Sequence, residues 1–254
     1  MSSGPALSRE DIFKELDLWP VWRLRDAPAG STKADLAQEI PTDAPCANQR
    51  VPVRLKDALS WDALREAVNT CTRCKLHKTR TQGVFGVGDQ HADWLIVGEA
   101  PGADEDAQGE PFVGQAGRLL DAMLAAIGLR RGDNVYIANV LKSRPPGNRN
   151  PEPDEVAACM PYLLQQIELL QPKIILAMGR FAAQNLLASK DAIASLRGRV
   201  HYFQGVPLIV TYHPAYLLRT LADKAKAWED LCLARQTYAA VQSETPMQSD
   251  VISA

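Results

Sequence analysis

Four short apolar runs, separated by segments of helical spacing, constrain the fold of this chain more than any other feature. The runs are residues 94–97, 135–138, 174–178 and 208–210. Runs that are short, continuous and rich in β-branched residues are typical of strands buried on both faces of a sheet. Apolar stripes at helical spacing occupy residues 119–127, 156–167 and 181–187. Strands that alternate with helices predict an α/β fold with a parallel sheet and helices on both faces.

The folded domain is predicted to span residues 58–241 and to open with a helix. Ser60 is a typical N-cap residue, and apolar side chains follow it at helical spacing. Near the other end, Gln204-Gly205 predicts a hairpin turn that pairs residues 200–203 with the fourth apolar run. We expect a last helix at about residues 220–240.

The segments outside this domain differ from it in composition. Residues 1–57 are rich in proline with short polar runs between the prolines, so we expect a largely flexible extension. An apolar and aromatic island at residues 9–25 ends in two arginines. It either packs on the main domain or docks a replication or repair protein, because aromatic and arginine anchors suit partner surfaces. Residues 242–254 are expected to form a disordered tail.

Net charge and hydropathy limit the class of protein. The formal net charge of −2 does not indicate a nucleic-acid partner, so a DNA-binding interpretation must rest on a local basic patch. No uninterrupted apolar run approaches the ~20 residues of a membrane helix, and the first residues lack the apolar core of a secretory signal. We therefore expect a cytoplasmic monomer with no membrane association.

Polar side chains follow each of the four predicted strands. Glu99 and a run of acidic residues follow the first, Asn139 the second, Arg180 the third and His213 the fourth. In an open parallel sheet, ligands bind beyond the carboxyl ends of the strands. These side chains should therefore converge on one rim. From their chemistry alone they indicate a site for a polar small molecule or a nucleotide.

Five cysteines are present, at positions 46, 71, 74, 159 and 232. An odd number without an export signal argues against a disulfide framework. Cys71 and Cys74 form a C-x-x-C pair that follows a helical pattern. A redox pair would instead stand at a helix start after a strand, so this position favours a metal or cluster clip.

Long segments, rather than single residues, carry the most specific signal in this chain. They are VGEAPGADEDAQGEPFVGQAG (residues 97–117), IANVLKSRPPGNRNPEPDE (137–155) and YHPAYLLR (212–219), with CTRC and VFGVGD upstream. Together they resemble the family 4 uracil-DNA glycosylases, over about residues 60–240. The resemblance implies a three-layer α/β/α sandwich around a four-stranded parallel sheet. It also implies an enzyme that hydrolyses the N-glycosidic bond of flipped-out deoxyuridine in DNA and so starts base excision repair.

The resemblance implies roles for four residues around a flipped uracil. Asn139 would supply the donor and acceptor that pair with uracil and that cytosine reverses. Phe112 would stack on the base, and Glu105 would wall the pocket near C5, where thymine carries its methyl group. Ala100 would line the pocket at the position where related family 1 enzymes carry an aspartate base, so that carboxylate is missing here.

Two catalytic roles are implied as well. His213 would donate near uracil O2 and stabilise the leaving uracil anion, where negative charge develops as the bond breaks. Glu99 would orient the attacking water through its side chain. The histidine would thus act on the leaving base, and the carboxylate would act on the attacking water.

DNA contact is assigned to local basic residues, because the chain as a whole is slightly acidic. These residues are Lys142, Arg144, Arg149, Arg197, Arg199 and Arg219. Neutralisation of phosphates by this set would make binding fall with salt. Leu217, or its neighbour Leu218, would wedge into the gap left by the flipped base. The alternative, that both leucines belong to a buried helix start, stays open.

Family 4 enzymes hold a [4Fe–4S] cluster with four cysteines, and this chain matches part of that set. The matching cysteines are Cys71, Cys74 and Cys159. Ser143 stands at the remaining position, and a serine oxygen is a hard, basic ligand that suits cluster iron poorly. Three outcomes stay open: the cluster survives with Ser143 or water on one iron, Cys46 or Cys232 substitutes, or the cluster is absent. We favour a bound or labile cluster with a structural role.

Three alternative functions stay open. The first is a broader specificity for deaminated bases, including hypoxanthine or xanthine. The second is a damage-binding protein like family X, which traps uracil-DNA covalently through a histidine in a KRRIH loop. Residues 142–145 carry no histidine, which favours turnover over trapping. The third is a small-nucleotide binder with no DNA role.

Overall fold

The computed structural model describes residues 60–244 of the chain. The predicted extension 1–57 with its docking peptide at 9–25, Cys46 and residues 245–254 lie outside the described residues. The strands are β1 (Val87–Gly88), β2 (Trp94–Gly98), β3 (Val135–Asn139), β4 (Ile174–Met178), β5 (Val200–Phe203) and β6 (Val206–Thr211). The α-helices are α2 (Trp61–Asn69), α3 (Ala103–Gln108), α4 (Gln115–Ala126), α5 (Pro153–Leu170), α6 (Arg180–Leu187), α7 (Ile193–Leu196), α8 (Pro214–Leu217) and α9 (Lys224–Glu244). Short 3₁₀ turns are η1 (Lys75–Lys78), η2 (Pro146–Asn148) and η3 (Leu221–Asp223).

The sheet of the described part has six strands, in the order β1-β3-β2-β4-β6-β5. Its four inner strands contain the four predicted apolar runs, and each pairs in parallel with its neighbour. The predicted four-stranded sheet is therefore too small. β5 pairs antiparallel with β6, which confirms the hairpin, and β1 pairs antiparallel with β3 at the other edge. β1 has only two residues, too few to leave a period in the sequence.

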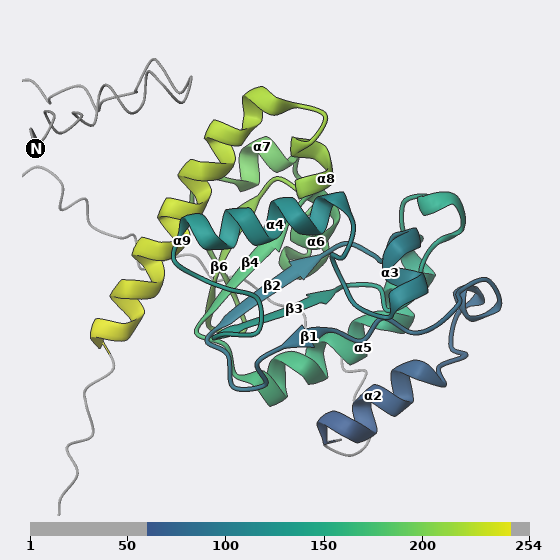
Figure 1. The fold of residues 1–254 in the computed structure, drawn as a ribbon. Coiled ribbons are helices and arrows are strands. Elements are labelled where there is room, and N and C mark those ends of the chain that lie inside the picture. Colours follow the sequence, from purple (N-terminus) through teal and green to yellow (C-terminus); the bar gives the residue numbers. More distant parts are fainter. Residues whose placement is uncertain (1–59, 245–254) are drawn as a thin grey trace, which may run out of the picture. The chain divides into compact units, whose positions relative to one another are not determined.

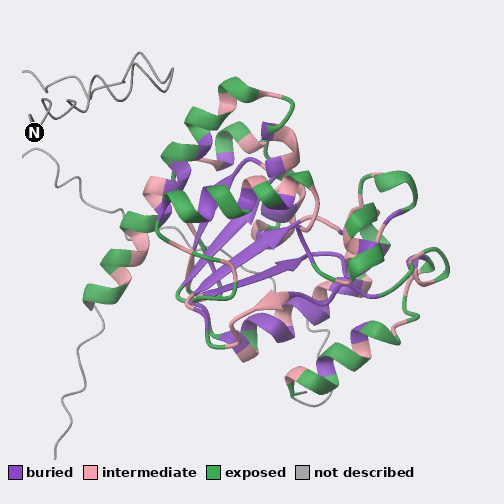
Figure 2. Cartoon of the chain, in the orientation of Figure 1, coloured by how far each residue is buried: buried purple, intermediate pink, exposed green. Residues whose placement is uncertain are grey.

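Alternate side chains of the inner strands enter two separate cores. Leu95 and Val97 of β2 pack with residues of α5 and α6, whereas Trp94 and Ile96 pack with residues of α4 and α9. Because side chains alternate across a strand, helices on both faces require apolar residues at every strand position. This is the predicted three-layer α/β/α arrangement. Figure 1 shows α4 and α9 on one side of the sheet and α5 on the other, and Figure 2 shows the buried strands between them.

A helix lies at each end of the described part. α2 begins after Ser60, whose hydroxyl accepts a hydrogen bond from the Ala63 amide (3.3 Å), as predicted for an N-cap. The last helix, α9, starts later than predicted and continues to Glu244, so the expected disordered tail does not begin at residue 242. Among the helices of residues 60–244, none combines the length and apolarity that a membrane crossing requires.

The parallel register brings the strand ends to one edge of the sheet. Gly98 and Asn139, the last residues of β2 and β3, are paired. The pairing continues beyond them, because Val140 N donates to Gly98 O (3.0 Å) and Leu141 N donates to Glu99 O (3.0 Å). The segments that follow β2 and β3 therefore run side by side, on the rim where polar residues were predicted to converge.

Candidate functional site

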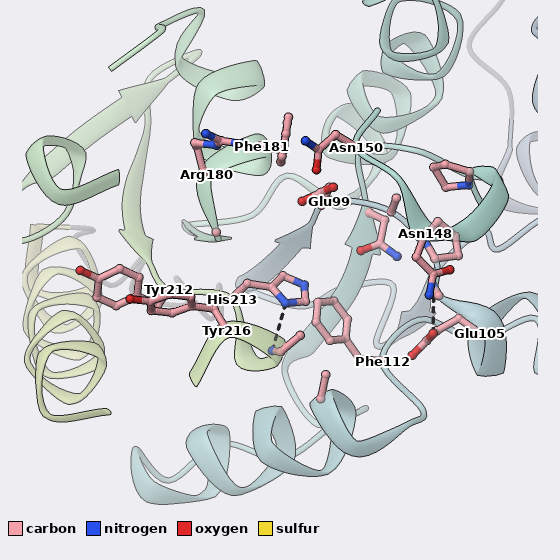
Figure 3. Close-up of a pocket in the computed structure, with 18 of the residues that line it drawn as sticks. Glu99, Glu105, Phe112, Asn148, Asn150, Arg180, Phe181, Tyr212, His213 and Tyr216 are labelled. Atoms are coloured by element: carbon pink, nitrogen blue, oxygen red, sulfur yellow. Dashed lines mark hydrogen bonds between the residues drawn. The ribbon is translucent and has the colours of Figure 1, made fainter. Parts of the chain in front are cut away.

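A cavity of about 680 Å³ lies at the carboxyl ends of the strands. Segments that follow all four inner strands contribute to its wall, as expected for an open parallel sheet. The predicted site residues that line it are Glu99, Ala100, Glu105, Phe112, Asn139, Arg149, His213 and Arg219. Figure 3 shows His213 and Phe112 beside one another, with Glu99 facing the same space.

The side-chain amide of Asn139 lines this cavity and lacks a partner. The residue is 2% exposed, and its Oδ1 accepts no hydrogen bond from any described residue. A buried oxygen without a donor costs about 1–3 kcal/mol, which indicates a group that awaits a ligand. Gly98 leaves the space free, because a Cβ there would lie 2.6 Å from Phe112 Cζ and would also collide with Asn139 Oδ1. The cavity next to this amide therefore depends on a glycine at position 98.

The Phe112 ring is held in place by its backbone. It stacks on His213 with ring centroids 5.3 Å apart and an interplanar angle of 28°. Its φ of 57° is in the left-handed region, which is costly for a bulky residue. Arg131 stabilises this turn, because its guanidinium donates to Pro111 O (3.0 Å) and Phe112 O (2.8 Å). The cavity thus has a fixed aromatic wall that suits a flat ligand.

His213 is the N-cap of α8, and this role decides its tautomer. Its Nδ1 accepts a hydrogen bond from the Ala215 amide (3.2 Å), so the neutral ring carries its proton on Nε2. Burial, and then the nearby Arg219, lower the pKa of His213 to about 4. The imidazole is therefore neutral at pH 7, with an N–H donor in the cavity wall. Gly179, with φ of 90°, permits this position, because a Cβ there would lie 2.9 Å from His213 Cβ.

Glu99 enters the cavity from the end of β2. Burial raises the pKa of its carboxyl to about 7, and the charge of Arg180 partly offsets that rise. Near neutral pH both protonation states are populated, so the carboxyl can accept or donate a proton. Arg180, Phe181 and Asn150 also line the cavity, and they lie above Glu99 in the view of Figure 3. Ala100, beside it in sequence, supplies no second carboxylate.

Glu105 also lines the cavity, but its carboxylate oxygens are already occupied. Oε2 accepts from Gly102 N (2.9 Å), and Oε1 accepts from Val113 N (3.1 Å) and more distantly from Gly114 N (3.5 Å). The side chain therefore joins the start of α3 to the loop that carries Phe112. Its predicted contact with C5 of a base stays a prediction.

Three predicted DNA contacts are wholly or largely buried. Lys142 is 1% exposed with its Nζ bonded to buried groups, and burial lowers its pKa to about 7. Arg197 forms an inward ion pair with Asp230 (2.9 Å). Leu217 is 1% exposed and packs in the core below α4 and α9. These three assignments are corrected, because residue type alone does not say which way a side chain points.

The other predicted contacts stay accessible to different degrees. Arg199 and Arg219 are exposed. Arg144 and Arg149 are partly buried and hydrogen-bonded to neighbouring side chains of their own loop and of α5. Leu218, at 41% exposed, is the member of the leucine pair that faces solvent.

The cavity contains further residues that sequence reasoning did not assign to the site. They include Asn148, Asn150, Phe181, Tyr212 and Tyr216. Arg180, which directly follows β4, also lines the cavity, as the strand-end rule predicted. Tyr212 and Tyr216 stack with centroids 5.0 Å apart, but Tyr212 precedes α8, so no helical spacing indicated this pair. The two asparagines lie in and after η2, in an irregular loop whose path no periodicity predicts.

The three predicted cluster cysteines do not share one set of contacts. The free thiols of Cys74 and Cys159 lie in one hydrophobic cluster, and their interaction lowers the pKa of Cys74 and raises that of Cys159. Cys71 packs instead with the hydrophobic cluster that contains Tyr162. Residues 60–244 hold no group of three His, Cys, Asp or Glu side chains that could bind a single metal ion.

Another interaction occupies the fourth position of the predicted cluster site. Ser143 is 4% exposed, and its hydroxyl accepts a hydrogen bond from Arg80 Nη1 (2.9 Å). The same guanidinium donates to backbone carbonyls within residues 68–71. Cys232 lies on α9, across the sheet from α5, and is therefore no substitute ligand. The described residues do not supply the four thiolates that the predicted cluster needs.

Comparison with known proteins identifies relatives of the whole domain. The family model described as the Uracil DNA glycosylase superfamily matches residues 85–232. The chain is 50% identical over 167 residues to a type-4 uracil-DNA glycosylase of Archaeoglobus fulgidus, which covers 63% of this chain and 83% of the relative. A type-4 enzyme of Pyrobaculum aerophilum is 46% identical over 178 residues, 67% of this chain and 90% of the relative. A type-5 uracil-DNA glycosylase of Thermus thermophilus is 33% identical over 149 residues, 51% and 68% of the two chains.

The raised pKa of Glu99 predicts a pH-dependent loss of stability. Its pKa is near 4.5 when unfolded and about 7 when folded. Between these values the unfolded chain binds fewer protons, so ionisation of Glu99 lowers the free energy of unfolding as pH rises. Glu99→Gln removes this effect. In urea unfolding from pH 5 to about pH 8, the stability of the variant should therefore rise relative to wild type.

The exposed Glu110→Gln is the matched control, and its stability should follow wild type across the same pH range. Parallel stability curves for wild type and Glu99→Gln would show that burial does not perturb this carboxyl.

Proposed function

This chain belongs to the uracil-DNA glycosylase superfamily, and we propose that it hydrolyses the N-glycosidic bond of flipped-out deoxyuridine in DNA. Its type-4 relatives are named for that activity. The observation that carries the proposal is that a buried, unpartnered amide, Asn139, and a neutral histidine, His213, line one cavity. The amide can read a base edge, and the histidine can stabilise the departing base. The products are free uracil and an abasic site, which starts base excision repair.

Asn139 would recognise the base by two hydrogen bonds. Uracil offers N3–H as a donor and O4 as an acceptor, which match Oδ1 and Nδ2 of an amide, whereas cytosine reverses this pattern. The unpartnered Oδ1 supports the assignment, because the base would supply the missing donor. Phe112 would stack on the base. Glu105, whose carboxylate is held by backbone amides, would stand near C5.

His213 would stabilise the departing base. When the C1′–N1 bond breaks, its electron pair stays with uracil as an anion and the sugar becomes oxocarbenium-like. A neutral Nε2–H donates to the charge that develops at O2. The lowered pKa supports this role, because it keeps the ring uncharged near pH 7, and the hydrogen bond from Ala215 holds the ring in one orientation.

Water must then bond to C1′, and Glu99 would orient that water and accept its proton. Glu105 is unsuited, because its oxygens are bonded to backbone amides, and Ala100 has no carboxylate. The pKa of Glu99 is raised to about 7, so the ionised form that can accept a proton becomes more populated as pH rises through neutrality.

DNA would bind across the open side of the cavity. The exposed Arg199 and Arg219 would contact phosphates, and Arg180, which is also exposed, joins them. Each phosphate contact would contribute to a fall in affinity with salt. Leu218 replaces Leu217 as the side chain that would enter the base stack, because it is the exposed one of the two.

Among residues 60–244, the predicted iron–sulfur cluster has an incomplete set of ligands. Cys71, Cys74 and Cys159 are present, but the hydroxyl of Ser143 is engaged by Arg80. Cluster iron prefers thiolate, so we propose that any cluster bound through these three thiols is labile. When bound, it would connect the segment after α2 to α5, and we assign it no chemical step.

His213→Ala should greatly reduce uracil excision. The assay is single-turnover release of uracil from a labelled oligonucleotide, read as strand cleavage in alkali at the abasic site. Loss of one donor to the developing anion predicts a rate about 10²–10³ lower. His201→Ala is the matched control and should keep the wild-type rate, because His201 lies on β5, does not line the cavity, and its ring bonds to the Leu196 carbonyl at the end of α7.

A wild-type rate in His213→Ala would refute the leaving-group role. Wild-type protein that yields no alkali-labile product would refute the glycosylase function itself, and a heat-stable adduct would indicate covalent trapping instead.

Asn139→Asp should change the choice of base. An ionised aspartate offers two acceptors and no donor, so it cannot donate to uracil O4, whereas the exocyclic amine of cytosine can donate to it. We expect a fall of at least about tenfold in uracil excision, or a gain of cytosine excision, measured on paired oligonucleotides. Unchanged uracil kinetics in a variant with the wild-type melting temperature would refute this assignment.

Ser143→Cys should increase the iron content of the protein. The change restores the fourth thiolate, and a [4Fe–4S] cluster with four thiolates is more stable than one with three. Iron and acid-labile sulfide, measured after anaerobic purification, should rise from a substoichiometric level to about four of each per chain. Equal, full iron content in wild type and variant would contradict a labile site.

A further inference from the structure

Lys142 is a buried lysine that donates a hydrogen bond to the backbone of Asn139, the residue proposed to read the base. Its Nζ donates to Asn139 O (2.8 Å) and to Gln166 Oε1 (2.6 Å). Gln166 lies on α5 and is itself fully buried. The ammonium therefore connects the end of β3 to the helix that covers that face of the sheet.

The bonds continue beyond Gln166 into the core. Gln166 Nε2 donates to Phe85 O (3.0 Å) and to the Tyr136 hydroxyl (3.3 Å). Tyr136 lies in β3, and Phe85 lies two residues before β1, the edge strand that pairs with β3. The Gln166 amide, which accepts the hydrogen bond from Lys142, is thus fixed by its own two hydrogen bonds. Lys142 is therefore bonded to a side chain that is itself held in place.

Lys142 has no carboxylate partner among the described residues. None of its hydrogen bonds or ion pairs within residues 60–244 involves a carboxylate. Burial of a lysine without a carboxylate partner costs stability, because the charged form loses its hydration and gains no opposite charge in return. Folding stability therefore does not explain a lysine at this position. Groups that cost stability are typical of functional sites.

We propose that Lys142 is a positioning residue, which holds the Asn139 carbonyl so that the Asn139 side-chain amide presents one fixed donor–acceptor pattern to the cavity. The geometry supports this because the Asn139 side chain has no bond of its own to orient Oδ1. Val140 N and Leu141 N are bonded to the strand-end segment of β2, so the lysine completes the set of contacts that fix this strand end. The inference rests on the proposed function, since a fixed pattern matters for reading a base.

Lys142→Met is the variant that tests the proposal. Methionine has similar volume and no charge; relief of the buried charge offsets the loss of the donor to Gln166 Oε1, so we expect a melting temperature close to that of wild type. We also expect kcat for uracil excision to fall about 10- to 100-fold, because a small displacement of a positioning group has an effect of that size. KM and affinity for the abasic product DNA should stay unchanged, since Lys142 is too buried to touch DNA. Lys173→Met, a half-exposed lysine paired with Asp93 at the other end of the sheet, is the matched control and should keep wild-type kinetics.

A second measurement does not depend on activity. In ¹H–¹⁵N spectra, the Asn139 side-chain amide, assigned by its absence in Asn139→Asp, should give one sharp pair of signals in wild type and broadened or multiple signals in Lys142→Met. A folded Lys142→Met with wild-type kcat and an unchanged Asn139 signal would overturn the proposal. Loss of folding, or a fall in kcat that follows a lowered melting temperature, would overturn it too, because the lysine would then be structural. Inactive wild-type protein would overturn the proposed function, while the spectra would still decide the positioning role.

Discussion

Exclusion of water from the carboxyl end of the sheet is the constraint on which the rest of this structure depends. The inner strands are buried on both faces, so the polar residues that end them are partly or wholly removed from solvent as well. Burial keeps His213 neutral and raises the pKa of Glu99 to about 7. In water these groups would titrate at their ordinary values, and neither would have the protonation behaviour that the proposed reaction uses.

Side chains that bond to the backbone position the irregular loops around this edge. Glu105 joins the start of α3 to the Phe112 loop, Arg131 holds the left-handed turn at Phe112, and Arg80 joins the end of α2 to Ser143. Loops lack the repeating hydrogen bonds of helices and strands, so each needs such partners for its amides and carbonyls. The cavity wall can therefore be rigid although much of it is irregular.

The side chains of the segment from Asn139 to Ser143 lie in two different environments. Asn139 lines the cavity, whereas Lys142 points into the interior between the sheet and α5. Ser143 accepts a hydrogen bond from Arg80 and does not line the cavity. We therefore expect a change of ligand at residue 143 to leave the cavity residues in place. The predicted cluster and the proposed base-excision chemistry are separable parts of this protein.

Local pattern was sufficient for the α/β class, the four inner strands, the helices on both faces and the β5–β6 hairpin, because each follows from periodicity or from a turn. It also pointed to Glu99, Asn139 and His213, because the rule that ligands bind at strand ends converts a position along the chain into a position in space. The directions of single side chains were different. Lys142 turns inward and Leu217 is buried beside an exposed neighbour, and a long basic or apolar side chain in a loop or short helix has no period that would reveal this. Those directions, and the two-residue edge strand β1, depend on which distant segments pack together, and that packing exists only in the folded chain.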